Sequence, residues 1–154
     1  MVNPGREIPK NSWIDQLMEK VNQLIKQSTS TCSTTKIVTT ESAYNACLQN
    51  WYTPDDTMGL HSDDEDYLCP EFPIFSVSWG GPRRFLLSPK DKAITINKTA
   101  EVCLTEGDLL IMGGACQLTH KHQVPKLRVT KDPPTWNRIN WTIRAVKILK
   151  NEFK

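Results

Sequence analysis

A histidine inside the most acidic part of the chain is the first feature with chemical potential. His61 and Asp63 stand two residues apart in MGLHSDDEDY, and seven carboxylates fall between Asp55 and Glu71 with no lysine or arginine among them. On a strand, residues two apart share a face, so one imidazole nitrogen and one carboxylate oxygen would project together. A solvated acidic loop is the alternative, because a histidine near an acid occurs by chance in many chains.

A third metal ligand has to come from elsewhere in the chain. The only other histidines are His120 and His122, both in THKHQVP. Two histidines and one carboxylate on a β scaffold form a facial triad, which binds Fe(II) and leaves coordination positions open. Oxygen chemistry requires such open positions, and on this pattern alone either histidine can complete the triad.

The segment RINWTIR alternates polar and apolar residues. On a strand the two kinds take opposite faces: Arg138, Asn140, Thr142 and Arg144 on one, Ile139, Trp141 and Ile143 on the other. A polar face in water is the ordinary arrangement. Two arginines flanking an amide and a hydroxyl also suit a small dianion, because a guanidinium can bind a carboxylate through two hydrogen bonds. A dicarboxylate beside a facial-triad iron suggests 2-oxoglutarate.

The elements that must position these residues are mostly strands. Turn sequences separate short runs rich in β-branched and aromatic residues, which are KIVTT, YNACLQNWY, FPIFSVSW, RFLLS, AITIN, EVCLT, DLLIM, THKHQV and RINWTIRAVKIL. Eight or more short strands without interleaved helices predict a mainly β fold, either an antiparallel sandwich or a jelly roll.

One helix is expected before the strands. Ser12 can cap it, Asp15 follows as a capping-box partner, and apolar residues recur at helical spacing from Trp13 to Ile25. The polar stretch QSTSTCSTT ends this pattern. We therefore expect an N-terminal helix and loop at residues 1–35, packed outside a jelly-roll domain at residues 36–150.

Composition limits the number of domains and the cellular location that we expect for this chain. At 154 residues one domain is expected, and no apolar run approaches the ~20 residues of a membrane-spanning helix. Five scattered cysteines without CxxC spacing suggest free thiols. We expect an intracellular monomer, cytoplasmic or nuclear, without membrane association. From Lys121 to Lys154 nine lysines and arginines stand against two carboxylates, which fits either a polyanionic partner or a solvated face.

The chain resembles the AlkB family of Fe(II)/2-oxoglutarate-dependent dioxygenases from about Tyr44 to Val146. The resemblance rests on NWY, MGLHSDDE, PIFSVSWGGPRRFLL, GDLLIMGG, HKHQVP and RINWTIR, in the family's order. It implies a double-stranded β-helix, the cupin-like jelly roll, with iron bound by His61, Asp63 and His122. We prefer His122 to His120 because it directly precedes QVP, which matches the triplet after the family's distal histidine.

The resemblance also implies a cosubstrate site. Arg138 and Arg144 would anchor the two ends of 2-oxoglutarate, and Asn50, Tyr52 and Asn140 would add hydrogen bonds. Asn50 and Tyr52 share a strand face, so the sequence permits their joint action.

Four further residues are candidates for the substrate side. Asp64 and Glu65 match an acidic pair that lies near the substrate base in the family, with a solvated turn as the alternative. Arg83 and Arg84 could hold phosphates, with cross-strand charge pairing as the alternative.

The implied activity is oxidative demethylation of N-alkylated bases in DNA or RNA, releasing formaldehyde, succinate and CO2. A single-stranded or flipped base is the expected substrate, since a paired base hides the methyl group. The family usually carries a nucleotide-recognition lid ahead of the jelly roll, and the segment before the match predicts a reduced or absent lid. Two rival functions stay open: a 2-oxoglutarate oxygenase acting on protein or lipid, and a catalytically silent jelly-roll binding module.

Overall fold

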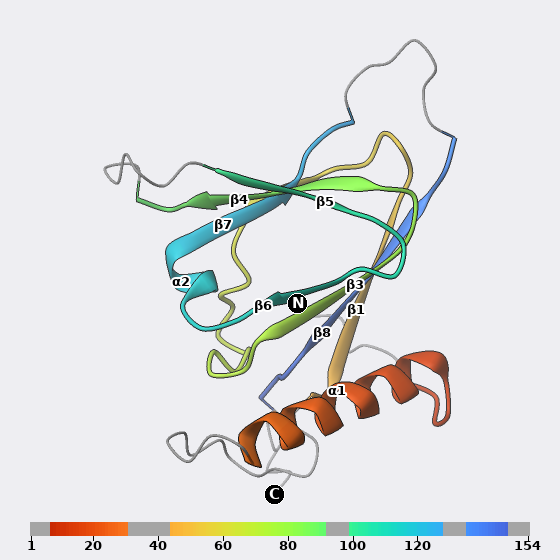
Figure 1. Cartoon of the computed structure of the whole chain (residues 1–154), viewed down its shortest axis with the longest axis vertical. Coiled ribbons are helices and arrows are strands. Elements are labelled where there is room, and N and C mark those ends of the chain that lie inside the picture. Colours follow the sequence, from red (N-terminus) through yellow and green to blue (C-terminus); the bar gives the residue numbers. More distant parts are fainter. Residues whose placement is uncertain (1–6, 31–43, 92–98, 128–134, 148–154) are drawn as a thin grey trace, which may run out of the picture.

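Two antiparallel sheets face each other and form the β domain (Figure 1). The computed structural model describes residues 7–30, 44–91, 99–127 and 135–147. The first sheet has the order β1-β8-β3-β6, with strands Ala46–Tyr52, Arg138–Arg144, Ile74–Gly80 and Leu109–Met112. The second has the order β2-β7-β4-β5, with strands Met58–His61, His120–Val124, Arg83–Pro89 and Ala100–Leu104. The predicted mainly β jelly roll is confirmed.

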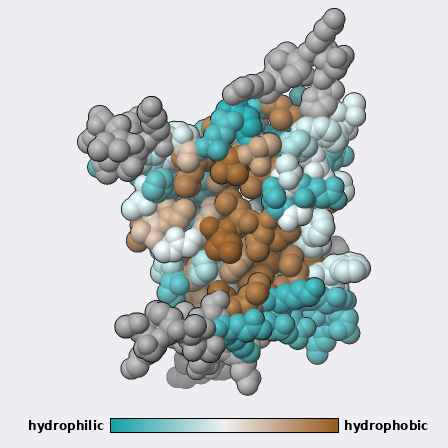
Figure 2. Space-filling view, in the orientation of Figure 1, coloured by the Kyte–Doolittle hydropathy of each residue, from teal (hydrophilic) through white to brown (hydrophobic). Residues whose placement is uncertain are grey.

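Apolar side chains from both sheets fill the space between them. Strands β1, β3, β4, β5, β6 and β7 each contribute one side chain to a buried apolar cluster: Tyr52, Ile74, Phe85, Leu104, Met112 and Val124. The edge strand β6 also turns Leu109 and Ile111 outward, where they are 47% and 55% exposed. Figure 2 shows apolar surface gathered in the middle of the face on which β3 and β6 are seen.

Helix α1, Trp13–Ser30, packs on the outer face of the first sheet (Figure 1). Its Met18 and Val21 are buried together with Phe75 and Ile143 of the sheet. Helix α1 begins as the sequence predicts, since the Asp15 amide donates to Ser12 Oγ at 3.2 Å. The predicted helix outside the β domain is thus confirmed.

No helix in the described part of the chain is long and apolar enough to cross a membrane. The predicted domain boundary after residue 35 falls at residues 31–43, outside the described residues, so the division of the chain remains a prediction. The runs KIVTT and AITIN also lie outside them.

Two local features differ from the expectations. Strand β2 ends at His61, so Asp63 lies beyond the strand and not on it. The amide of Asp63 donates to the side chain of Gln117 at 2.9 Å, and not to a neighbouring strand. A one-turn helix, α2 (Cys116–Thr119), follows the MGG turn before β7, and Thr119 Oγ1 donates back to the Ala115 carbonyl at 2.8 Å.

Candidate metal and cosubstrate site

Three potential metal ligands meet where β2 pairs with β7. His61 and His122 are direct partners in this pairing, and their ring centroids lie 4.2 Å apart. Asp63 Oδ1 lies 3.8 Å from His61 Nε2, and Asp63 Oδ2 lies 3.9 Å from His122 Nε2. One ligand atom from each residue falls within 4.8 Å of the others. Two imidazole nitrogens and one carboxylate oxygen at this spacing suit a single divalent cation such as Fe(II).

The low pKa of His122 and the hydrogen bond of His61 favour coordination. Burial, followed by repulsion from His61 and Arg144, lowers the pKa of His122 to about 4. His122 is therefore neutral at physiological pH, which is the form that binds a metal. His61 Nδ1 lies 2.8 Å from the Gly59 carbonyl, and an Nδ1 proton donated there leaves Nε2 as the free ligand atom.

His120 lies outside this group. Its Nδ1 is 2.8 Å from Thr119 Oγ1, and its carbonyl accepts a hydrogen bond from Ser62 Oγ at 2.9 Å. Among the described residues, the one cluster of three or more histidines, cysteines or acids with metal-ligand spacing contains His61, Asp63 and His122. The structure therefore favours His122 as the third ligand.

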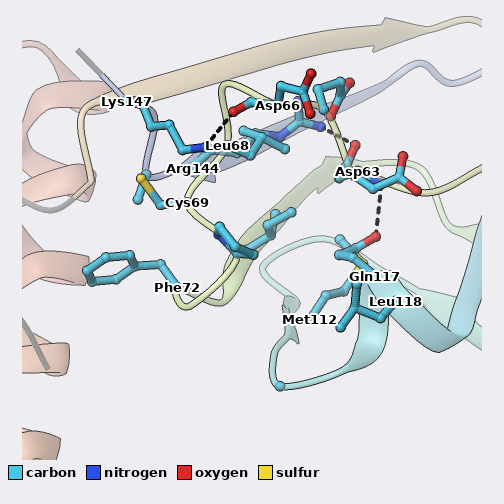
Figure 3. A pocket seen from close by; sticks show the side chains of 16 residues that line it. Asp63, Asp66, Leu68, Cys69, Phe72, Met112, Gln117, Leu118, Arg144 and Lys147 are labelled. Atoms are coloured by element: carbon cyan, nitrogen blue, oxygen red, sulfur yellow. Dashed lines mark hydrogen bonds and ion pairs between the residues drawn. The ribbon is translucent and has the colours of Figure 1, made fainter. Parts of the chain in front are cut away.

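Two residues hold Asp63 from different elements (Figure 3). Arg144 Nη2 of β8 donates to Asp63 Oδ1 at 2.7 Å, and Gln117 Oε1 of α2 accepts from the Asp63 amide at 2.9 Å. Asp63 is only 5% exposed, so its carboxylate is fixed in a buried position. The sequence analysis missed Gln117, because no spacing rule connects residues 54 positions apart.

A cavity of about 260 Å³ lies beside the three candidate ligands. Asn50 and Tyr52 of β1 line this cavity. The polar residues of β8 line it too, and these are Arg138, Asn140, Thr142 and Arg144. Strand register explains the grouping, since Tyr52 pairs with Arg138 and Asn50 with Asn140. The polar face of β8 thus points into the domain, whereas its apolar face carries the fully buried Ile143 beneath α1.

Unpaired arginine donors make this cavity suitable for an anion. Arg138 is 2% exposed, and its Nη2 donates to Ser78 Oγ at 2.9 Å. Its Nε and Nη1 are buried without a hydrogen-bond partner, as is Nε of Arg144. Buried unsatisfied donors on a cation are costly, so an anionic acceptor would stabilise both side chains. A dicarboxylate such as 2-oxoglutarate fits this donor set.

Ser76 and Ser78 of β3 are further site residues that the sequence analysis missed. Asn140 Nδ2 donates to Ser76 Oγ at 2.7 Å and to the Val77 carbonyl at 3.0 Å, and Ser78 accepts from Arg138. Strand β3 pairs with β8, and both serines are buried. The available signal was two serines at alternating positions in the otherwise apolar run FPIFSVSW.

Glu65 is the one substrate-side candidate from the sequence that lines the cavity beside the triad. Asp64 is exposed, and its carboxylate pairs with Lys90 Nζ at 3.1 Å. Arg84 Nε lies 2.7 Å from Glu101 Oε1 across the β4–β5 pairing, as the alternative interpretation expects.

Arg83 corrects the expectation of a phosphate contact. Its side chain is 1% exposed, and its guanidinium donates to the carbonyls of Thr53 and Pro125 at 3.1 Å each and to that of Asp56. These bonds tie the loop after β1 to the end of β7. Because the guanidinium is buried and bonded to the backbone, Arg83 has a structural role in this fold.

The chain resembles known proteins in sequence and in fold. Residues 4–144 match the family model for the 2OG-Fe(II) oxygenase superfamily. The mouse alpha-ketoglutarate-dependent dioxygenase alkB homolog 3 is 36% identical over 115 residues, covering 70% of this chain and 38% of the relative. The mouse DNA oxidative demethylase ALKBH2 is 34% identical over 112 residues, covering 70% of this chain and 45% of the relative.

A solved structure of OsALKBH1 has a similar fold. It aligns with a TM-score of 0.58 and 24% identity, covering 89% of this chain and 64% of that one. The chain matches less than half the length of the two curated relatives.

Proposed function

Because the chain belongs to the 2OG-Fe(II) oxygenase superfamily, with AlkB-like relatives, we propose that it is an Fe(II)- and 2-oxoglutarate-dependent dioxygenase that demethylates N-alkylated bases in DNA or RNA. The supporting observation is the juxtaposition of His61, Asp63 and His122 with buried, unpaired donor atoms of two arginines. The three candidate ligands and both arginines line one cavity, which supports a shared site for the metal and 2-oxoglutarate.

The residues of this chain would bind and orient the cofactors. His61, Asp63 and His122 would hold Fe(II), with Asp63 offsetting part of the metal charge. Arg138 and Arg144 would hold 2-oxoglutarate, with hydrogen bonds from Asn50, Tyr52 and Asn140. Bound iron and 2-oxoglutarate would supply the oxidising chemistry that uses O2 to hydroxylate the methyl group, with succinate and CO2 as the other products. The hydroxymethylated base then releases formaldehyde.

The substrate would be a nucleic acid with an accessible alkylated base. One of the relatives is named a DNA oxidative demethylase, which supports this class of substrate. A methyl group in a paired base is shielded by its neighbours, so a single-stranded or flipped base is the form we propose.

We also propose a monomer in the cytoplasm or nucleus. The described cysteines Cys47, Cys69, Cys103 and Cys116 are free, which fits a reducing compartment.

Decarboxylation of 2-oxoglutarate separates this function from its rivals. We expect purified protein with Fe(II) to form succinate faster when N-methylated single-stranded DNA or RNA is added. Asp63→Asn should abolish the stimulation, because it weakens a ligand, and Asp64→Asn should keep it, because the Asp64 carboxylate pairs with Lys90. Stimulation only by peptides or lipids would favour the protein-or-lipid oxygenase. No succinate under any condition would favour a silent binding module.

A further inference from the structure

We propose that Tyr67 recognises the substrate: its ring is the platform on which the alkylated base stacks at the mouth of the cavity, and its hydroxyl orients the Glu65 carboxylate toward that base. This inference rests on the proposed function and names a recognition residue for it.

Tyr67 occupies the border between the cavity and solvent. It lines the same cavity as His61 and Glu65, yet it is 40% exposed, whereas Tyr52, which lines the cavity too, is 5% exposed. A large aromatic ring on the rim of a polar cavity leaves apolar surface in water that a planar ligand would cover. Flipped bases are held by stacking on aromatic side chains and by hydrogen bonds to their edges.

The backbone that carries Tyr67 is fixed. The Leu68 amide donates to the Glu65 carbonyl at 2.9 Å, which closes a tight turn around Tyr67. The Lys147 amide donates to the Tyr67 carbonyl at 2.8 Å, and Leu68 forms a β-bridge with Val146. Lys147 Nζ further donates to the Asp66 carbonyl at 2.7 Å (Figure 3). A platform fixed before binding loses little conformational entropy when the substrate arrives.

The Glu65 carboxylate provides hydrogen-bond acceptors beside the Tyr67 ring. Both side chains line the same cavity, and the turn closed by the Leu68 amide on the Glu65 carbonyl holds Tyr67 two residues from Glu65. Burial and the negative charge of Glu65 raise the pKa of Tyr67, so its hydroxyl keeps its proton and can donate to this carboxylate. The remaining lone pairs of the carboxylate can accept from an N–H group on the base edge.

The test is binding of an N-methylated single-stranded oligonucleotide to protein loaded with Mn(II) and 2-oxoglutarate, followed by fluorescence anisotropy. We expect Tyr67→Ala to weaken binding by about 5- to 150-fold, the range for losing one base–aromatic stack. Tyr67→Trp should restore most of the affinity. Tyr67→Phe should keep the stack and lose the bond to Glu65, so its affinity should fall between those of wild type and Tyr67→Ala.

Trp51→Ala is the matched control. Trp51 is 60% exposed on β1, but it points away from the cavity that its neighbours Asn50 and Tyr52 line. This variant should bind the oligonucleotide as wild type does. Affinity for 2-oxoglutarate should also stay unchanged in Tyr67→Ala, which distinguishes lost stacking from a collapsed site.

Wild-type affinity in Tyr67→Ala would overturn the inference, and so would an equal loss in Trp51→Ala, which would mean non-specific aromatic binding. The proposed function survives either result if methylated oligonucleotides still stimulate succinate formation. If the wild-type protein bound no oligonucleotide and showed no stimulation, the proposed function would fail together with this inference.

Discussion

His122 is the residue whose role most clearly separates two interpretations of the sequence. Two histidines in THKHQVP could each complete a triad, and the structure pairs His122 with His61 while the His120 ring contacts Thr119. We expect His122→Ala to weaken binding of a divalent metal by more than about 100-fold, which exceeds the usual effect of an outer-shell partner. His120→Ala should bind metal as wild type does.

Calorimetric titration with Mn(II) measures both variants. The ligand assignment would be wrong if His120→Ala lost the metal and His122→Ala kept it.

At this scale the sequence was informative where residue types repeat at strand spacing. Arg138 and Arg144 could be singled out because period-two patterns need no knowledge of the fold. The same pattern singled out His61 and Asp63, although Asp63 lies beyond the end of β2. Gln117 could not be singled out, since its role depends on which distant segments come together. Arg83 was misjudged for the same reason: its burial depends on carbonyls from two other loops.

At the scale of elements, the one-turn helix α2 holds the segment that carries Asp63 of the candidate metal site. Gln117 Oε1 accepts a hydrogen bond from the Asp63 amide, and Gln117 Nε2 donates to Met112 Sδ at 3.6 Å. We expect Gln117→Ala to weaken metal binding by about 10- to 100-fold, because the segment that carries Asp63 loses its anchor. The metal titration used for the histidine variants measures this effect.

Leu118→Ala is the control for α2, because Leu118 is the next residue of the same helix and is 70% exposed. It should leave the metal affinity unchanged. Equal affinities in wild type and Gln117→Ala would show that Asp63 needs no support from α2.

Strand β8 shows where an element can be predicted and its orientation cannot. The alternation in RINWTIR predicts the strand and its two faces. Which face is inward depends on the helix that covers the apolar one, and Ile143 is fully buried beneath α1. The polar face is then left to form the wall of the cavity.

At the scale of the whole molecule, the buried neutral His122 links folding to pH. Its pKa of about 4 in the folded protein lies below the ordinary 6.5, so between these values the unfolded chain takes up a proton that the folded chain does not. Stability of the metal-free protein should therefore fall as the pH drops from 6.5 to 4, by up to roughly 3 kcal/mol from this group.

Urea unfolding of wild type and His122→Asn at several pH values isolates this contribution. The variant cannot take up this proton, so its stability should depend less steeply on pH across the same window. Identical slopes for the two proteins would contradict a buried neutral His122.

The sheet order is also a property of the whole molecule that the sequence did not reveal. Short strands separated by turns predict a jelly roll, but the order β1-β8-β3-β6 joins segments far apart along the chain. Trp141 of β8, for example, donates to Gln49 of β1 across 92 positions. Local sequence patterns carry no information about such pairings. The arrangement of the site residues therefore could not be predicted from the sequence.

Removal of methyl groups from nucleic-acid bases is the activity that we propose for this chain. The most direct measurement is mass spectrometry of an N-methylated single-stranded oligonucleotide after aerobic incubation with the protein, Fe(II) and 2-oxoglutarate. We predict loss of the methyl mass, with one formaldehyde and one succinate for each methyl removed, and no loss with Asp63→Asn. Retention of the methyl group in both DNA and RNA after incubation with wild-type protein would contradict the proposed function.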